Sequence, residues 1–463
     1  MQNRDITELT GGQSLEELKR NGLDHLWFQM QQYNDVAGPD GLDIIVNGEG
    51  IYLENAEGER FIDGISGLWV VNAGHGRKEI ADAVYDQIQR VNYANTFKYG
   101  NIPAIKLATK LAQITPGDLS KTFFCSGGAE AVETAIKVAR QYHVNNGDRG
   151  RFKVIARRLS YHGATLGALS IAGSPILRPW LFEPLAPIGV HVDPIYCYRC
   201  PWSLEYPSCG IQCAMEVEKA IQFENPETVS AVIAEPVSIS AGNVVPVPEY
   251  YPMLREICDK YGVLMIADEV ITGFGRTGKM FACEHFGVVP DIMTTAKGLS
   301  SGYQPLAATI VRGQVAERFT GGDEEAFTHG ITFGSHPVAC AAGVANLEIF
   351  ERENLAENSA KMGAYLLSQL NSLADEHPVV GDVRGLGLLC GVELVKDRQT
   401  KERFPKEARV GPRLVHKLEE LGMLTRAADV LFLAPPLVIK KEEVDKMVDI
   451  VDRGLGWLEK ELN

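Results

Sequence analysis

A carboxylate and a lysine stand in surroundings that are unusual for charged side chains. Asp268 ends the apolar run GVLMIAD, and Lys297 lies among small residues in TTAKGLSSG. Charged groups are seldom buried without a partner, and burial lowers the pKa of a lysine, which makes its amine a usable nucleophile. The two side chains therefore indicate covalent amine chemistry beside a negative charge. The alternatives are an aspartate that caps a loop and a lysine in solvent.

Glycines in the stretch FFCSGGAEAVETAIK separate an apolar run from a helical pattern. The backbone N–H groups of Gly127, Gly128 and Ala129 would then lie at a helix N-terminus, an arrangement that binds phosphate. A tight turn without a ligand is the alternative. The stretch lacks the Gly-Lys-Ser/Thr of a P-loop and the third glycine of a dinucleotide-binding turn, so it favours neither of those sites.

An amine, an acid and a phosphate site together meet the needs of pyridoxal phosphate. This cofactor forms a Schiff base with a lysine, needs a carboxylate against its ring nitrogen, and carries a phosphate. The carboxylate keeps the ring nitrogen protonated, so that the ring can accept electrons from a substrate carbanion. A buried strand that ends in Asp268 would hold the carboxylate in one direction.

The elements that must position these groups are short, almost unbroken apolar runs: FKVIARR, VSAVIAEPV and GVLMIADEV. Such runs are typical of parallel strands buried on both faces. They alternate with helical patterns between about residues 95 and 312, which indicates a mostly parallel α/β sheet. Ligands of such sheets bind beyond the carboxyl ends of the strands, which is where Asp268 would lie.

The two ends of the chain have different patterns from its middle. VNGEGIYLENAEGERFIDG reads as a small antiparallel meander, and strands and helices follow one another after two long helical stretches beyond Phe333. We therefore predict a large domain over residues 76–340 and a smaller α+β domain. Residues 1–75 would form the N-terminal segment of that smaller domain, and residues 341–463 its C-terminal part.

Composition and charge exclude several classes of partner. The 463-residue chain has a net charge of −15 and a pI of about 5.2, which makes nucleic acid and anionic membranes unfavourable partners. It has no apolar run of about 18 residues that would suit a membrane helix, and its N-terminal stretch is polar. An odd number of cysteines, nine, indicates free thiols. We expect a cytoplasmic protein.

The chain resembles the class III aminotransferases among the pyridoxal phosphate enzymes, in particular the ω-amino acid and amine:pyruvate branch. The resemblance covers nearly the whole chain. It runs, in the family's order, through GLWVVNAGHGR, FFCSGGAEAVETAIK, SYHGATLGALS, AEPV, LMIADEVITGFGRTG, AKGLSSGYQPL, HGITFGSHP and LAPPLVI. It implies the fold type I architecture: a large domain with a mostly parallel central sheet, and a smaller α+β domain built from both chain ends.

The resemblance also implies roles around the cofactor. Lys297 is similar to the Schiff-base lysine, which also moves the substrate proton, and Asp268 to the partner of the ring nitrogen. Val270 and Tyr161 would pack on opposite faces of the ring, although Tyr161 could be an ordinary buried tyrosine. The phosphate would be bound at Gly127, Gly128 and Ala129. Ala129 stands where many relatives have a hydroxyl.

Further roles implied by the resemblance concern the rim of the site. Glu235 is similar to a glutamate close to the cofactor, and Thr332 to a threonine that reaches the phosphate of a neighbouring subunit. Thr332 implies a homodimer with shared active sites, or a tetramer; alternatively, its hydroxyl stabilises a loop. Substrate would be bound by Tyr161 and by Leu68, Trp69 and Arg426. Trp69 could instead be core, and Arg426 could be part of a surface ion pair.

The predicted activity is transfer of an amino group from an ω-amino acid or amine to a keto acid, with pyruvate as the acceptor, by a ping-pong mechanism. A decarboxylase or an aminomutase of the same fold is the alternative. We assign no metal to the active site. The spacing C-x2-C-x8-C-x3-C of Cys197, Cys200, Cys209 and Cys213 fits either a structural zinc or a loop of free thiols.

Overall fold

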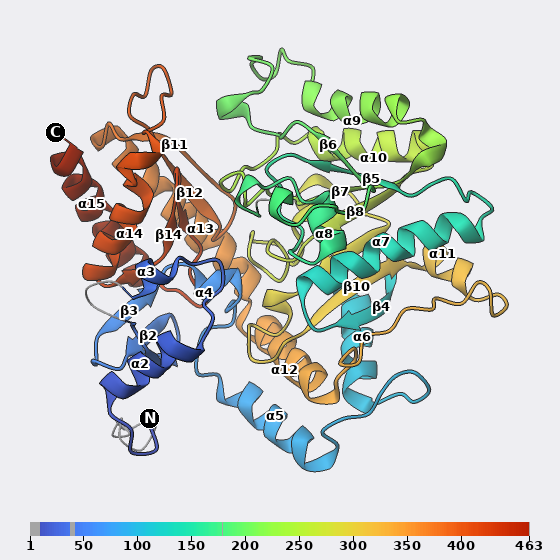
Figure 1. Ribbon diagram of the computed structural model, residues 1–463, viewed down its shortest axis with the longest axis horizontal. Helices are drawn as coiled ribbons and strands as arrows, with labels where there is room; N and C mark the ends of the chain where they lie inside the picture. Colours follow the sequence, from blue (N-terminus) through green and yellow to red (C-terminus); the bar gives the residue numbers. More distant parts are fainter. Residues whose placement is uncertain (1–9, 38–41, 178, 463) are drawn as a thin grey trace.

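The computed structural model describes residues 10–37, 42–177 and 179–462 (Figure 1). Residues 1–9 and 38–41 of the predicted N-terminal segment lie outside the described residues. Within the described ranges, the largest sheet has seven strands in the order β4-β10-β9-β8-β7-β5-β6. These strands are β4 (Leu119–Cys125), β5 (Lys153–Arg157), β6 (Gly189–Val192), β7 (Val229–Ala234), β8 (Leu264–Asp268), β9 (Ile292–Thr295) and β10 (Ala307–Arg312).

The central sheet is mostly parallel, as the sequence predicts. β6, β5, β7, β8 and β9 pair in parallel, and only β10 runs against its neighbours β4 and β9. Every residue of β7, β8 and β9 is buried, which explains why these strands read as continuous apolar runs. Their carboxyl ends therefore meet at one edge of the sheet.

Helices cover both faces of the central sheet. Side chains of α7 (Gly128–Asn145) pack with Val154 and Ile266 on one face. Side chains of α9 (Gln212–Phe223) and α10 (Tyr250–Tyr261) pack with Ile155 and Met265 on the other. Adjacent strand residues thus point to opposite faces, as the pleat requires. Figure 1 shows α9 and α10 beside the sheet, with α7 on the side of the sheet away from them.

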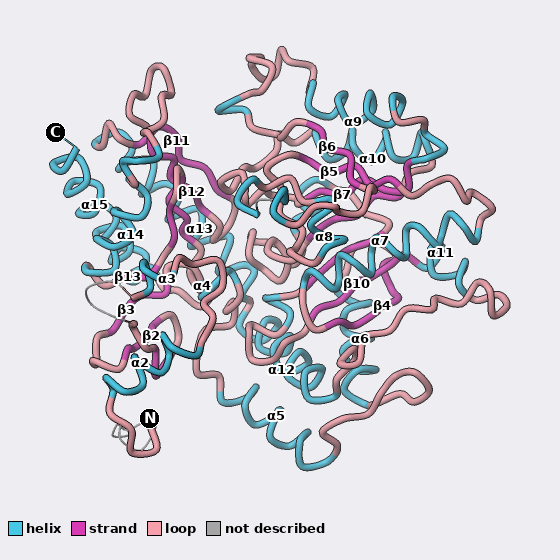
Figure 2. The backbone as a smooth tube through the Cα atoms, viewed as in Figure 1, coloured by secondary structure: helices cyan, strands magenta, loops and turns pink. Residues whose placement is uncertain are grey.

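The two chain ends meet in a smaller α+β part (Figure 2). β1 (Ile45–Glu49), β2 (Tyr52–Asn55) and β3 (Arg60–Asp63) form the predicted antiparallel meander, and β13 (Met423–Leu424) adds to β3 in parallel. A second sheet has the order β11-β12-β15-β14. Its strands are β11 (Val380–Gly385), β12 (Cys390–Leu394), β15 (Val430–Leu433) and β14 (Arg426–Ala427).

Long helices complete the C-terminal half. The helices after the central sheet are α12 (Pro337–Glu353), α13 (Leu355–Glu376), α14 (Val410–Glu420) and α15 (Lys441–Leu462). The remaining α-helices of the described residues are α2 (Leu15–His25), α3 (Tyr33–Val36), α4 (Ser66–Trp69), α5 (Lys78–Arg90), α6 (Ile102–Ile114), α8 (Leu166–Ile171) and α11 (Gly313–Ala316). The predicted fold is confirmed. The domain limits at 75/76 and 340/341 stay predictions. In the described part of the chain, no helix combines the length and apolar character of a membrane span.

Candidate active site

The candidate residues lie after neighbouring strands of the central sheet. Tyr161 follows β5, Glu235 follows β7, Asp268 ends β8 and Lys297 follows β9. The parallel register aligns Asp268 with Thr294 on the next strand, so that the turn carrying Lys297 begins beside the carboxylate. The topology thus brings to one edge four side chains that are far apart in the sequence.

Lys297 lies in a tight turn after β9. Its backbone has a φ of +46°, a left-handed conformation that costs a non-glycine residue free energy and is often found at functional sites. Burial lowers the pKa of the Lys297 amine to about 8, with Asp268 and Glu235 opposing the shift and Arg426 adding to it. A larger fraction of the amine is therefore neutral, and nucleophilic, near neutral pH.

Asp268 is buried and held by three partners. Its carboxylate accepts hydrogen bonds from the Thr294 hydroxyl at 3.1 Å and from the backbone N–H of Val270 at 3.2 Å. Its second oxygen lies 2.7 Å from Nδ1 of His162, whose side chain is fully buried. These contacts fix the Asp268 carboxylate in one orientation at the end of the strand.

Glu235 is a second buried acid at the same edge. It accepts hydrogen bonds from the backbone N–H of Tyr161 at 3.2 Å and the Ser238 hydroxyl at 3.0 Å. Arg157 lies 3.4 Å from its carboxylate. Burial raises the pKa of Glu235, and Asp268 adds to the rise, whereas His162 and Arg157 oppose it. The acid therefore ties the Tyr161 loop to the end of β7.

The glycine turn opens α7 as the sequence predicts. The helix begins at Gly128, its N-cap is Gly127, and it has no side-chain cap, so its first N–H groups stay available for an anion. A Cβ atom on Gly128 would lie 3.0 Å from Val270 and 3.6 Å from the Cβ of Ala296. A side chain at this position would crowd Val270, because the helix start approaches both Val270 and the residue before Lys297.

Trp69 reaches the same region from the N-terminal segment. Its side chain is buried and packs edge-on against Phe432, with ring centroids 5.5 Å apart. The Lys297 Nζ atom lies 5.7 Å from the centroid of the indole. The ring thus belongs to a small apolar cluster and also lies near the amine, and its contact with substrate stays a prediction.

Comparison with known proteins agrees with this geometry. The family model for class III aminotransferases matches residues 36–455. The chain belongs to the class III aminotransferase family. A putrescine–pyruvate aminotransferase of Pseudomonas aeruginosa is 36% identical over 90% of this chain and 91% of that protein.

Two solved structures are similar along almost their whole length. A thermostable (S)-enantioselective omega-transaminase from Thermomicrobium roseum has a TM-score of 0.93 and 42% identity, over 96% of this chain and 99% of that one. An amine transaminase from an uncultivated Pseudomonas species, in its PLP-bound form, has a TM-score of 0.90 and 36% identity, over 94% and 98%. Class III aminotransferases depend on pyridoxal phosphate.

The rim of the aminotransferase site is less tightly built. Tyr161 is 38% exposed and Leu68 is 43% exposed. Arg426 lies on β14, exposed, and is close enough to affect the pKa of Lys297. Thr332 is exposed, and its carbonyl accepts a hydrogen bond from the Tyr93 hydroxyl at 2.7 Å. Among the described residues no hydrogen bond joins Thr332 to Lys297 or Asp268.

His162 is the residue of this aminotransferase that sequence reasoning missed. It directly follows Tyr161 in SYHG and contacts Asp268, but nothing in its local pattern separates it from a surface histidine. Strand order could have found it, because β5 lies beside β7 and β7 beside β8. Its Nε2 atom is buried and has no hydrogen-bond partner in the described part of the chain.

The four-cysteine loop of the aminotransferase lies between β6 and α9. Cys197 is exposed, and Cys200, Cys209 and Cys213 are half-buried. Burial raises the pKa of Cys213 to about 11, and the Cys197 and Cys209 thiols add to the rise. The cysteines are therefore neighbours, yet no group of three or more His, Cys, Asp or Glu residues in the described chain is arranged to hold a metal. The zinc alternative has no geometric support.

Proposed function

We propose that this aminotransferase binds pyridoxal 5'-phosphate at the carboxyl edge of the central sheet and transfers an amino group from an ω-amino acid or amine to pyruvate. The observation that carries the proposal is the Lys297 amine, which a left-handed turn holds at the strand edge that also carries the buried Asp268 carboxylate. Burial lowers the pKa of this amine to about 8. The residues fit the cofactor. They offer an amine for its aldehyde, an anion for its ring nitrogen and an uncapped helix N-terminus for its phosphate.

Each residue around the cofactor has a proposed task. Lys297 would bond the aldehyde and, once released, carry the proton between the substrate carbon and the cofactor; Asp268 would hold the ring nitrogen protonated. When bound, the cofactor withdraws electrons and so acidifies the substrate C–H. The other contacts would come from Gly127, Gly128 and Ala129 at the phosphate, Tyr161 and Val270 on the ring faces, and Glu235 behind Tyr161.

The substrate would lie between the ring of Trp69 and the exposed rim formed by Leu68, Tyr161 and Arg426. A guanidinium without an ion pair among the described residues suits a carboxylate, which it can bind with two parallel hydrogen bonds. Arg426 would thus bind the carboxylate of the keto acid and leave its place when an uncharged amine enters. The putrescine–pyruvate relative supports an amine donor and pyruvate as acceptor.

We also propose a homodimer with shared active sites, with a tetramer as the alternative, in the cytoplasm. Large apolar side chains are exposed along α5 and the segment that follows it, at Tyr85, Phe97, Tyr99 and Ile102, and Phe333 beside Thr332 is 60% exposed. Exposed apolar surface of this extent suits contact with a second copy. Thr332 would then reach the partner's phosphate. Sedimentation of the purified protein would give its oligomeric state.

Half-reactions test the proposed activity. An amine added to the cofactor-loaded protein without a keto acid should abolish the cofactor's visible absorption band, and pyruvate should restore it with formation of alanine. Initial rates over both substrates should give parallel double-reciprocal lines. Release of carbon dioxide would favour the decarboxylase, and turnover without a keto acid would favour the aminomutase. An unchanged band with every amine of a panel would overturn the proposal.

A further inference from the structure

Arg276 is a fully buried cation in the loop after β8. Its guanidinium donates hydrogen bonds to four neutral oxygens: the Leu388 and Pro435 carbonyls at 3.0 and 2.6 Å, the Ser66 hydroxyl at 2.9 Å and the Asn72 amide oxygen at 2.6 Å. No carboxylate in the described chain forms an ion pair with it. Burial lowers the pKa of Arg276 to about 9, and only Asp63 opposes the shift. Burying such a cation costs free energy, so a role other than stability is worth seeking.

Two of these four acceptors flank Trp69. Ser66 and Trp69 have φ values of +51° and +56°, and Gly67, between them, has a φ of +67°. Non-glycine residues keep such conformations only where the surroundings impose them. The Ser66 hydroxyl donates a hydrogen bond to the Ala434 carbonyl, and the Asn72 amide nitrogen donates one to the Phe274 carbonyl. Both side chains therefore present an oxygen to Arg276 in a direction that is already set.

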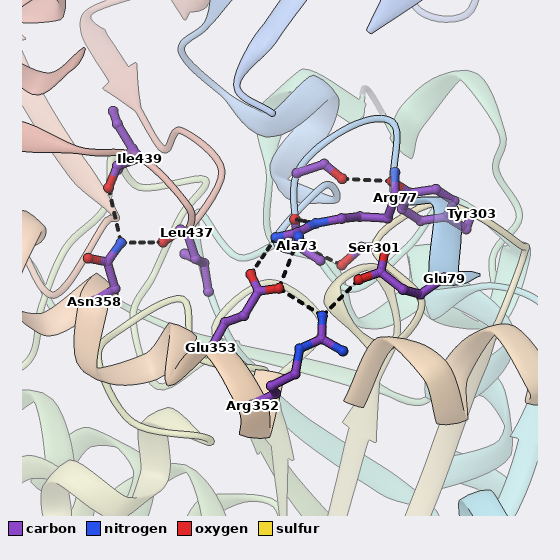
Figure 3. Close-up of polar contacts among 11 residues, drawn as sticks. Ala73, Arg77, Glu79, Ser301, Tyr303, Arg352, Glu353, Asn358, Leu437 and Ile439 are labelled. Carbon is purple, nitrogen blue, oxygen red and sulfur yellow. Dashed lines mark hydrogen bonds and ion pairs between the residues drawn. The ribbon is translucent and has the colours of Figure 1, made fainter. Parts of the chain in front are cut away.

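The other end of this segment is attached to the turn that carries Lys297. A Cβ atom on Gly298 would lie 2.5 Å from the amide nitrogen of Asn72, so the two are in close contact. The Ala73 N–H donates to the Ser301 hydroxyl at 3.0 Å, and the Arg77 N–H donates to the Tyr303 hydroxyl at 2.6 Å. Figure 3 shows the contacts of Ala73 with Ser301 and of Arg77 with Tyr303, together with the pairing of Arg77 with Glu353.

Arg276 also reaches the C-terminal half through its backbone. Its carbonyl accepts hydrogen bonds from the Leu388 N–H at 3.1 Å and the Ser359 hydroxyl at 2.8 Å. One residue therefore connects the Trp69 segment, the loop after β8, and the residues that precede β12 and follow β15, the strand that carries Phe432. A single ammonium could not join four acceptors in this way, because its donors do not form a planar fork.

We propose that Arg276 is a positioning residue that holds the indole of Trp69 over the Lys297 amine and so sets the size of the amine that the site accepts. The part about amine size rests on the proposed function. The part about position does not, because it concerns only where the indole lies. Arg276 itself is enclosed by protein and touches no substrate.

The first test measures Trp69 without cofactor or substrate. The fluorescence emission spectrum of Trp69 is obtained by subtracting the spectrum of the Trp69→Phe variant from that of the protein with Trp69. This difference is recorded once in the wild-type background and once in the Arg276→Lys background. Arg276→Lys should shift this difference spectrum to longer wavelength, because the released indole contacts water. Arg158→Lys, at a half-exposed arginine paired with Asp193, should leave it unchanged. An unshifted spectrum in folded Arg276→Lys protein would overturn the proposal.

The second test compares a small amine, β-alanine, with a bulky aryl amine. Arg276→Lys should change the ratio of their kcat/KM values by about tenfold, mainly through KM, and by less than about twofold in the Trp69→Phe background. Equal changes in both backgrounds would contradict a role through Trp69. If Arg276→Lys does not fold, Asn72→Ser removes one acceptor and should move both readouts in the same direction. Inactivity of the unmodified protein would refute the proposed function but leave the emission test decisive.

Discussion

The strand ends of the central sheet and the rim above them are built in different ways. Asp268 and Glu235 are buried and each has several hydrogen-bond partners. Arg426, Leu68 and Thr332 are exposed and come from a two-residue strand, a four-residue helix and a turn. The first region holds groups that every amino transfer needs. The second meets whichever donor and acceptor arrive. The contrast predicts that substitutions at the strand ends abolish catalysis, and that substitutions at the rim change selectivity.

Lys297→Ala should have the largest effect. Removal of the Lys297 amine should reduce turnover by about 10⁴-fold, because this amine is proposed both to bond the aldehyde and to carry the proton. Initial rates with an amine and pyruvate measure the loss. Lys219→Ala, at an exposed lysine paired with Glu216, is the control. Substantial activity in the Lys297→Ala variant would contradict the assignment of the catalytic amine to the strand ends.

Asp268→Asn should come next, with a loss of about 10²–10³-fold in kcat. The amide keeps the size of the side chain but does not stabilise a protonated ring nitrogen. It also cannot raise the pKa of Lys297, as Asp268 now does. Stopped-flow recording of the amine half-reaction would locate the loss in proton transfer. Asp193→Asn on the surface should keep full rates, and a wild-type rate in Asp268→Asn would contradict the assignment.

Arg426→Gln tests the rim. The KM for pyruvate should rise by about tenfold, which is the weight of a charge-assisted hydrogen bond at an exposed position. The rate with an uncharged amine in the first half-reaction should stay nearly constant. Steady-state kinetics with both substrates separates the two effects. A fall in kcat as large as that of the Asp268→Asn variant would contradict the prediction that substitutions at the rim change selectivity rather than catalysis.

The smallest expected effect is that of pH on cofactor capture. The Lys297 pKa is lowered to about 8, so the amine is protonated and unreactive below that pH and neutral above it. The rate at which cofactor-free protein captures pyridoxal phosphate should therefore rise about tenfold per pH unit up to pH 8 and level off above it. Absorbance after rapid mixing follows the capture. A rise that continues to pH 10 would show that the amine is not perturbed.

Sequence reasoning located the strand ends because they are local features. A continuous apolar run ending in an acid, or a glycine pair before a helical pattern, can be read directly, and β8 and α7 begin and end close to where such patterns place them. His162 could not be read, since its partner Asp268 comes from a strand two positions away in the sheet. The dual position of Trp69 depends on three left-handed residues and on contacts from the opposite end of the chain.

The rim is less predictable for the same reason. β13 and β14 have two residues each, too few for any periodicity to show, so nothing local predicts that Arg426 lies on a strand. The assignments of the rim residues Leu68 and Thr332 rest on the family resemblance, and their roles stay predictions. For the cysteine loop, spacing alone could not distinguish a metal cage from neighbouring thiols, because the distinction depends on how the loop closes.

The parallel pairing of β3 with β13 has a consequence for biosynthesis. The N-terminal meander emerges early, but its fourth strand, Met423–Leu424, leaves the ribosome only when nearly all of the chain has been made. A contact this distant in sequence forms late and slowly. The sheet next to the Trp69 segment therefore closes late, and a chain released before residue 424 would carry the N-terminal meander without its complete fourth strand.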